Sequence, residues 1–500
     1  MVGFARHVKL TVVGATGFVG RLLVPHLAAA GHQVTAVARR LPALAALPTL
    51  PSDPDDLAAT DGSVRALAVD VGDEEAVATA LEGRDAAYYL VHSMAGTDFR
   101  ARDLELATAF GRAAARAGIG RIVYVGALGD DPGSEHLVSR QEVGTALGAA
   151  GVPVVELRAA VVIGSGSISF EMLRYLTERL PFMVCPRWVH TRLQPIAARD
   201  LLTYLERSLT AAPGVYEIGG AEITTYREMI AAYAHARGLR PRLIVDVPYL
   251  TPRLSSYWVD LVTPVDRRIS HALIDSLVTE VVVRDDERTA REFGIDPVSL
   301  DDAIRQALDD QDTALARDLF SCTEGLHDGV YSAKVTAAIA PTAGDAVRAE
   351  LGEIGGRYDW YGVARGWRLR VLLGRLFGER FLLRRSPRDD TGPVGQLAPG
   401  TPVDWWTVAR HTDDELVLRG DGWFAGEALL GYRVDGDAVL QVGALRTKGV
   451  PGFLYWKLLT PVHHLVFRLM AERRAAPRRG DQGFRLGIGT DAPASISPLR

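Results

Sequence analysis

The sequence has 500 residues, too many for one hydrophobic core, and suggests two or three domains. Hydrophobic residues make up 48% and charged residues 23%, an ordinary balance for a soluble globular protein, and the net charge of −5 does not favour a nucleic-acid partner. The two cysteines predict neither a disulfide framework nor a metal site, and no uncharged run reaches the ~20 apolar residues of a membrane span, so we expect a cytoplasmic protein.

Short apolar runs alternate with helical stretches from residue 8 to about residue 160. The runs predict strands over 8–15, 32–38, 64–70, 86–91, 121–126 and 153–162. Helices are expected over 18–30, 73–82, 99–117 and 135–150. Continuous apolar strands separated by amphipathic helices are typical of a doubly wound parallel sheet, the α/β class that includes the Rossmann fold. The proline-rich stretch 41–62 predicts a loop insertion.

The pattern loosens after residue 165 and continues to a helix over 298–308, which suits a substrate lobe built on the sheet. We therefore assign residues 1–315 to a Rossmann domain with its substrate lobe, and 316–328 to a linker. Strands and helices over 329–475 predict a second, α+β domain that ends in a long helix over 452–473. The Arg-, Gly- and Ser-rich tail 476–500 is expected to be disordered.

A glycine-rich motif lies between the first predicted strand and the first predicted helix. Gly14 permits a sharp turn, Gly17 lets the backbone approach a pyrophosphate, and Gly20 lets helix and strand pack closely. The helix N-terminus would present free N–H groups to the phosphates. The motif predicts dinucleotide binding, and a tight turn that only packs well is the alternative. The residues expected at the cofactor are Gly14, Thr16, Gly17, Phe18, Val19 and Gly20.

The ends of the following strands refine the cofactor prediction. Arg39 and Arg40 stand where NAD sites usually carry an acid, which favours the 2′-phosphate of NADP(H) over NAD, although a solvated arginine pair is the alternative. Asp70 and Val71 end the third strand, beside the expected adenine, although Asp70 could instead cap the next helix. After the fourth strand, the backbone at His92 and Ser93 is expected to pass the ribose.

These motifs give residues 8 to about 310 a resemblance to atypical and extended short-chain dehydrogenases/reductases, including NmrA-like proteins. The resemblance rests on VVGATGFVG, VARR, Asp-Val at 70–71 and RIVYVGALG, with RLQPIAARDLLTYL (192–205) and GVYEIGG (214–220) as apparent substrate-lobe landmarks. It implies a Rossmann fold and NAD(P)(H) chemistry on a small carbonyl, hydroxyl or alkene.

The sequence departs from that family at its catalytic Ser, Tyr and Lys. No lysine lies between Lys9 and Lys334, and His136 and Arg140 stand where the resemblance places Tyr and Lys. Arg140 could bind ribose hydroxyls but could not relay protons. His136 could act as acid or base, or could be an ordinary surface residue. Further along, the basic and polar residues Arg158, Arg187, His190, Thr191 and Arg192 suggest a pocket for an anionic or strongly polar group.

The second domain resembles a domain of uncharacterised function that is often fused to such reductases in bacteria. Its order of elements is similar to the helix-grip fold of START and polyketide-cyclase proteins. Six of the eight tryptophans lie there and could line an apolar cavity or fill a core. His463 and His464 point to different helix faces and have no suitably spaced partner, so we expect no metal.

The leading hypothesis is therefore an NADP(H)-dependent oxidoreductase acting on a small, apolar carbonyl or enone, with the second domain helping to bind it. A non-catalytic NADP(H) sensor or scaffold, as among NmrA-like proteins, is the second hypothesis. A cyclase or lyase with its chemistry in the second domain is the third.

Overall fold

The structure is a computed structural model that describes residues 8–40, 64–92, 98–129, 134–247, 278–317, 319–321, 325–327, 330–339, 344–351, 397–403, 406–422, 426–447 and 449–475. The chain divides into two compact units. The first comprises residues 1–317 with 448–451, and the second comprises residues 318–447 with 452–500.

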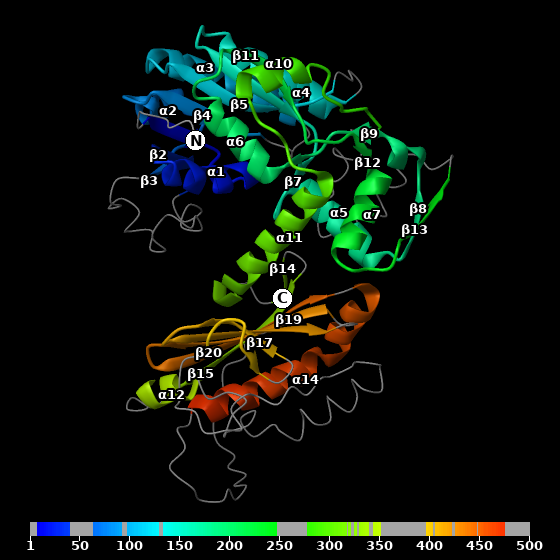
Figure 1. The fold of residues 1–500 in the computed structure, drawn as a ribbon. Coiled ribbons are helices and arrows are strands. Elements are labelled where there is room, and N and C mark those ends of the chain that lie inside the picture. The colour runs from blue at the N-terminus through cyan, green and yellow to red at the C-terminus, as the bar shows by residue number, and fades with distance from the viewer. Residues whose placement is uncertain are drawn as a thin grey trace, which may run out of the picture. The chain divides into compact units, whose positions relative to one another are not determined.

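A parallel sheet of seven strands forms the core of the first unit (Figure 1). Its strands in chain order are β1 (Lys9–Val13), β2 (Gln33–Ala38), β3 (Val64–Ala68), β4 (Ala86–Tyr89), β5 (Arg121–Ala127), β6 (Val154–Ala159) and β11 (Gly214–Ile218). The spatial order is β11-β6-β5-β4-β1-β2-β3. The chain therefore reverses its direction of winding between β1 and β4, the kind of switch point at which open α/β sheets bind ligands.

Helices cover both faces of this sheet, as expected for a doubly wound fold. One face packs against α2 (Glu74–Leu81), α3 (Phe99–Arg116) and α4 (Glu135–Gly148). The other packs against α1 (Phe18–Ala29), α6 (Ala198–Arg207) and α10 (Asp286–Phe293). Almost every side chain of β1 and β2 is buried, which explains why these strands read as continuous apolar runs. The predicted parallel Rossmann-like domain is confirmed.

Two segments interpreted as substrate-lobe landmarks belong to the main sheet and its helical layer. Residues 214–220 supply β11, which pairs in parallel with β6 from Gly214↔Val155 to Ile218↔Ala159. Residues 192–205 form β9 (Arg192–Leu193), β10 (Ile196–Ala197) and most of α6. The reason is packing, because Leu201 and Leu205 are buried in the same cluster as the inner residues of β1 and β6.

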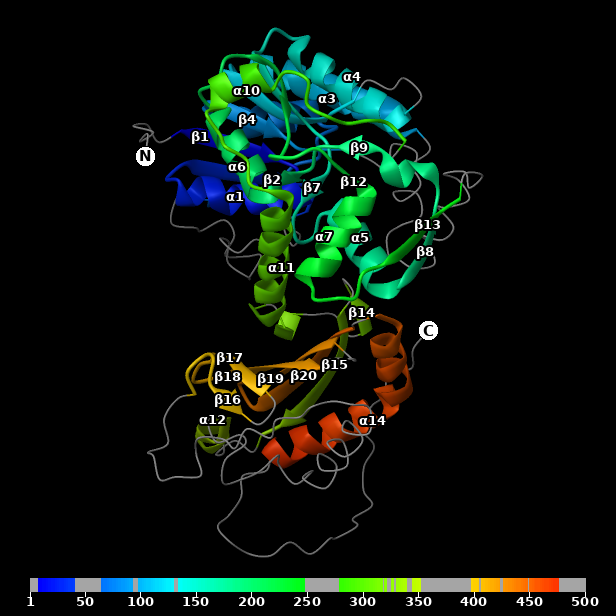
Figure 2. The ribbon, with the colours of Figure 1, turned by 45° about the vertical axis from the view of Figure 1, so that its right-hand side comes forward.

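The substrate lobe packs on the residues that follow β5 and β6. It contains β7 (Val162–Ile163), α5 (Ile168–Arg179), β8 (Phe182–Cys185), the 3₁₀ helix η3 (Arg187–His190), β12 (Thr224–Thr225), α7 (Tyr226–Ala236), β13 (Leu243–Asp246) and α11 (Leu300–Arg317). Figure 2 shows its helices α5 and α7 near β8 and β13. Ion pairs reinforce its helices. Arg174, 1% exposed, pairs with Glu171, and Arg237, the residue after α7, bonds Asp312 of α11 at 3.1 Å.

The second unit is mostly one antiparallel sheet in the order β14-β15-β20-β19-β18-β17-β16. Its elements are η4 (Leu319–Ser321), β14 (Gly325–His327), β15 (Val330–Ala338), α12 (Gly344–Leu351), β16 (Pro402–Val403), β17 (Trp406–His411), β18 (Glu415–Gly422), β19 (Gly426–Asp435), β20 (Ala438–Thr447) and α14 (Gly449–Ala475). Met470 and Ala471 of α14 join the buried residues of the sheet and of α12 in one core.

The predicted elements of the second unit correspond to β15, α12, the strands from β16 to β20 and α14. Part of the expected linker 316–328 is structured, since α11 runs to Arg317 and η4 and β14 follow it. The loop insertion 41–62 and the tail 476–500 lie outside the described residues. Within the described part, no helix is long and apolar enough to cross a membrane.

Candidate functional site

The glycine loop at the end of β1 has the geometry that the motif predicts. Gly14 has φ +88°, and a Cβ there would lie 2.8 Å from the carbonyl carbon and oxygen of Leu90, just after β4. A Cβ on Gly20 would lie 2.4 Å from the Gly14 carbonyl oxygen, so α1 packs directly on the loop. Neither position accepts a larger residue without a backbone shift.

The N-terminus of α1 is open to a ligand. Gly17 is the N-cap residue, is exposed, and has no side chain to bond the first turn of the helix. The N–H groups of Phe18 and Val19 therefore lie in the turn that lacks intrahelical acceptors and that attracts phosphate. A Cβ on Gly17 would approach only the Gly14 oxygen, at 3.3 Å. These residues, with half-buried Thr16, fit a dinucleotide pyrophosphate.

The two arginines lie next to this loop. The backbone N–H groups of Gly14 and Ala15 donate to the Val37 carbonyl at 3.3 and 3.2 Å, which fixes the loop against the end of β2. Arg39 and Arg40 follow that strand directly and are exposed. Among the described residues, no carboxylate forms an ion pair with either one. Both guanidinium groups are thus available to an anionic group bound at the loop.

The structure separates the two interpretations of Asp70. The N-cap of α2 is Asp73, whose carboxylate accepts the Ala76 N–H at 3.1 Å, so Asp70 does not cap that helix. Asp70 instead accepts the Gly72 N–H at 2.9 Å and fixes the turn after β3. Val71 is buried. A contact of either residue with adenine stays a prediction.

His92, His136 and Arg140 lie close together where β4 and β5 end. Arg140 Nη1 donates a hydrogen bond to the Val125 carbonyl at 3.4 Å. The Tyr124 hydroxyl donates to the backbone carbonyl of Arg140 at 3.0 Å. The Arg140 guanidinium lowers the pKa of His92 well below its ordinary range. Ser93 lies outside the described residues, and a role for any of the other three in catalysis or ribose binding stays a prediction.

His136 is half-buried in the first turn of α4 and is not an ordinary surface residue. Burial is the main cause that lowers the pKa of its imidazole to about 4, and the nearby Arg140 cation is the second. At neutral pH the ring is uncharged, so it can donate one hydrogen bond but holds no proton that it would release as a strong acid.

This pKa can be tested directly. Because it is lower in the folded chain than the ordinary 6.5, protonation favours the unfolded state, and stability should fall as the pH drops from 6.5 to about 4. Arg140→Met should raise the pKa of His136, since it removes the smaller of the two causes. A proton NMR titration of the histidine ring signals measures the pKa of His136 in the unaltered chain and in Arg140→Met. A His136 signal that titrates near 6.5 in the unaltered chain would contradict the low pKa.

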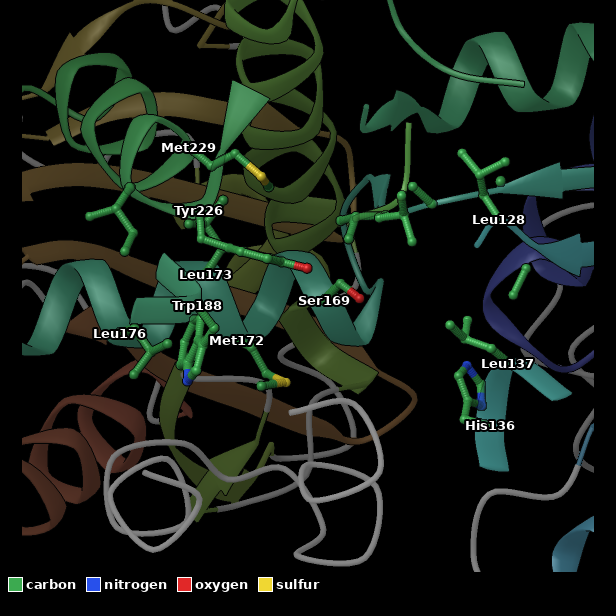
Figure 3. Close-up of a pocket in the computed structure, with 16 residues that line it drawn as sticks. Leu128, His136, Leu137, Ser169, Met172, Leu173, Leu176, Trp188, Tyr226 and Met229 are labelled. Atoms are coloured by element: carbon green, nitrogen blue, oxygen red, sulfur yellow. The ribbon is translucent and has the colours of Figure 1, made fainter. Parts of the chain in front are cut away.

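A mainly apolar pocket lies beside His136, between the main sheet and the substrate lobe (Figure 3). Its volume is about 130 Å³. One side is formed by the ends of β5 and β6 and the first turn of α4. The other is formed by α5, η3 and α7. Its lining residues are Ala127, Leu128, His136, Leu137, Ala159, Ala160, Val161, Ser169, Met172, Leu173, Leu176, Trp188, Tyr226, Met229, Ile230 and Val281.

The expected polar cluster after β6 does not line this pocket. His190 is exposed and pairs with Asp246 at 2.9 Å, and Arg192 pairs with Glu280 at 3.2 Å on the surface. Arg158 bonds the buried Glu156 at 2.7 Å. Among the described residues, these side chains are therefore not gathered around one pocket for an anionic or strongly polar group. Two residues of the predicted cluster remain. Thr191 follows η3 and does not line the pocket, and the Arg187 side chain lies outside the described residues.

Several pocket and loop residues were missed by sequence reasoning. The turn over 164–167 packs over α1, since a Cβ on Gly164 would lie 2.9 Å from the Phe18 ring. Arg21 also reaches that turn, since its Nη2 would lie 3.6 Å from a Cβ on Gly166. No spacing signal marks Trp188 or Tyr226, because they come from segments far from the glycine motif.

Comparison with known families supports the cofactor domain. Residues 14–151 match a family described as NAD(P)H-binding, and residues 327–470 match a family described as protein of unknown function (DUF2867). A search of curated proteins found no match. The first unit thus combines a Rossmann-like sheet with a match to an NAD(P)H-binding family, which supports a nicotinamide cofactor.

The likeness to solved structures is weak, with identities below 20% and TM-scores below 0.5. The Bordetella bronchiseptica enzyme WbmG, in complex with NAD and UDP, is 18% identical with a TM-score of 0.47, over 61% of this chain and 96% of that chain. The NADPH-dependent quinone oxidoreductase QOR2 of Escherichia coli is 19% identical with a TM-score of 0.47, over 59% and 98%. The triphenylmethane reductase of Citrobacter sp. is 17% identical with a TM-score of 0.47, over 60% and 99%.

Proposed function

We propose that the chain is an oxidoreductase that transfers hydride between NADP(H) and a small, apolar carbonyl or enone compound. One observation carries the proposal. A mainly apolar pocket lies beside His136, at the carboxyl edge of the sheet that also holds the glycine loop. Ligands of open α/β sheets bind at this edge. A bound nicotinamide supplies or accepts the hydride there.

The chain's own residues have separate tasks in this proposal. The glycine loop and the first turn of α1 hold the pyrophosphate, and Arg39 and Arg40 hold the 2′-phosphate. Arg140 remains our candidate for the ribose hydroxyls. The neutral His136 ring donates a hydrogen bond to the reacting oxygen and gives this proton to the alkoxide that hydride transfer forms, and solvent reprotonates the ring after product release. The apolar walls exclude water during the transfer.

The proposal predicts consumption of NADPH in the presence of a small ring carbonyl compound. We expect cyclohexanone, cyclohexenone or benzoquinone to oxidise NADPH in the presence of the chain. The loss of NADPH absorbance measures the rate. His136→Ala should lower kcat by at least about tenfold, because general acid–base or hydrogen-bond donors contribute this much or more. Lys9→Met is the control, since Lys9 lies at the amino end of β1, the opposite edge of the sheet, and should leave kcat unchanged.

The alternative function is a non-catalytic NADP(H) sensor. The observation in its favour is that His136 and Arg140 stand where the resembled family has its Tyr and Lys. A chain that binds NADPH tightly and consumes none with any of these carbonyl compounds would support the sensor and contradict the oxidoreductase.

For the second unit we propose a helix-grip arrangement, in which the antiparallel sheet wraps α14. Two contacts support it. Trp456 of α14 stacks on Tyr331 of β15 with ring centroids 5.8 Å apart, and a Cβ on Gly443 of β20 would lie 2.2 Å from the Phe467 ring. Among the described residues, no feature favours a cyclase or lyase centre in this unit.

A further inference from the structure

The pocket has room for one six-membered ring. Its volume is about 130 Å³. An apolar protein cavity of ~150 Å³ is large enough to bind benzene, which sets the scale. A compound much larger than a substituted ring would have to extend out of the pocket.

The pocket is also suited only to an uncharged compound. Among the described residues, its lining contains no Asp, Glu, Lys or Arg. His136, with its pKa lowered to about 4 by burial, adds no positive charge at neutral pH. A carboxylate or phosphate would lose its hydration here without finding a counter-ion, which is strongly unfavourable. The lining therefore excludes a sugar nucleotide phosphate group and admits a neutral ketone, enone or quinone.

Tyr226 places a hydroxyl in this apolar surface. It is the first residue of α7, and the start of that helix is fixed by a capping box between Thr225 and Glu228. Its ring lies edge-on to Trp188, with centroids 5.7 Å apart. Burial raises the pKa of the Tyr226 phenol, so it stays protonated and remains a donor.

The Tyr226 hydroxyl faces the cavity. In Figure 3 it points, with the Ser169 hydroxyl, into the space that separates α5 and α7 from His136 and Leu137. Among the described residues, neither hydroxyl has a hydrogen-bond partner. A polar group held in an apolar pocket without a partner is the usual means by which such a site orients one polar atom of a ligand.

We propose that Tyr226, assisted by Ser169, binds the carbonyl oxygen of an uncharged, single-ring substrate. Tyr226 thus adds a donor from the substrate lobe to that of His136, which lies on the helix that carries Tyr-x-x-x-Lys in the resembled family. That the bound ring compound is a substrate rests on the proposed function, but its binding needs no cofactor.

The test compares a ring ketone with its hydrocarbon in the full chain without cofactor. NMR titration measures the affinity for cyclohexanone and for cyclohexane. Tyr226→Phe should weaken cyclohexanone binding about three- to tenfold, the effect of losing one neutral hydrogen bond, and leave cyclohexane binding unchanged. Ser169→Ala should act in the same direction and less strongly. Tyr204→Phe is the matched control, because Tyr204 is a buried tyrosine of α6 that does not line the pocket.

The outcomes separate this inference from the proposed function. Equal affinities of the unaltered chain and Tyr226→Phe for cyclohexanone, or equal weakening for both ligands, would overturn the role of Tyr226. No saturable binding of either ligand would overturn the pocket assignment. Selective weakening in a chain that never consumes NADPH would uphold the binding site and contradict only the oxidoreductase.

Discussion

Replacing Gly20 by alanine is expected to weaken NADPH binding about 10- to 100-fold. The added Cβ would lie 2.4 Å from the Gly14 carbonyl oxygen and 2.7 Å from the Ala15 Cα, both of which are backbone atoms. Only a shift of α1 relative to the loop relieves this contact, at a cost of about 1–3 kcal/mol. The shift displaces the N–H groups that would bind the pyrophosphate, so we expect the cost to appear as lost affinity.

Gly148→Ala is the matched control for this prediction. Gly148 is also a helical glycine, at the end of α4, and a Cβ there would meet only Val154 Cγ2 at an ordinary 3.5 Å. Calorimetric titration with NADPH should give an unchanged Kd for this variant. If Gly20→Ala bound NADPH as tightly as Gly148→Ala, the cofactor would not lie at this loop.

Arg39→Ala is expected to reduce the preference for NADPH over NADH at least tenfold, and the double variant with Arg40→Ala should remove most of it. A charge-assisted contact with phosphate contributes about 1.5–3 kcal/mol, and both arginines are exposed beside the glycine loop. NADH lacks the 2′-phosphate, so its Kd should change little. Titration of both cofactors measures the ratio.

Arg65→Ala provides a surface-charge control. Arg65 is an exposed arginine of β3, near the amino end of that strand and away from the edge where the glycine loop lies. Its removal changes the net charge equally but should leave the ratio of the two Kd values unchanged. A chain that binds NADH and NADPH equally before any substitution would show that Arg39 and Arg40 do not select the cofactor.

The sequence was sufficient to predict the parallel sheet because its strands are buried on both faces. The predicted strand over 121–126 corresponds to β5 at Arg121–Ala127, and the helix over 135–150 to α4 at Glu135–Gly148. β11 was missed as a sheet strand because it lies at the edge with a mixed burial pattern, which carries a weak apolar signal.

The substrate pocket could not be predicted from sequence spacing. Its polar groups, His136, Ser169, Trp188 and Tyr226, come from four separate elements that only the tertiary fold brings together. The low pKa of His136 likewise depends on burial, which the local sequence does not reveal.

The expectation of an aromatic cavity in the second domain is only partly addressed. Trp406 and Trp456 are buried in hydrophobic clusters, which is the core-filling alternative. Trp360, Trp367, Trp405 and Trp423 lie outside the described residues. The apolar pocket described above belongs to the first unit, so the second unit is not needed to explain an apolar substrate.

The transfer of a labelled hydride decides between an oxidoreductase and a sensor. The full chain is incubated with a small ring carbonyl compound and NADPH deuterated at its transferable position, and the product is analysed by mass spectrometry. The proposed function predicts deuterium on the former carbonyl carbon, or on the β-carbon of an enone, and far less of it with His136→Ala. Tight NADPH binding with no labelled product from any ring ketone or enone would contradict it.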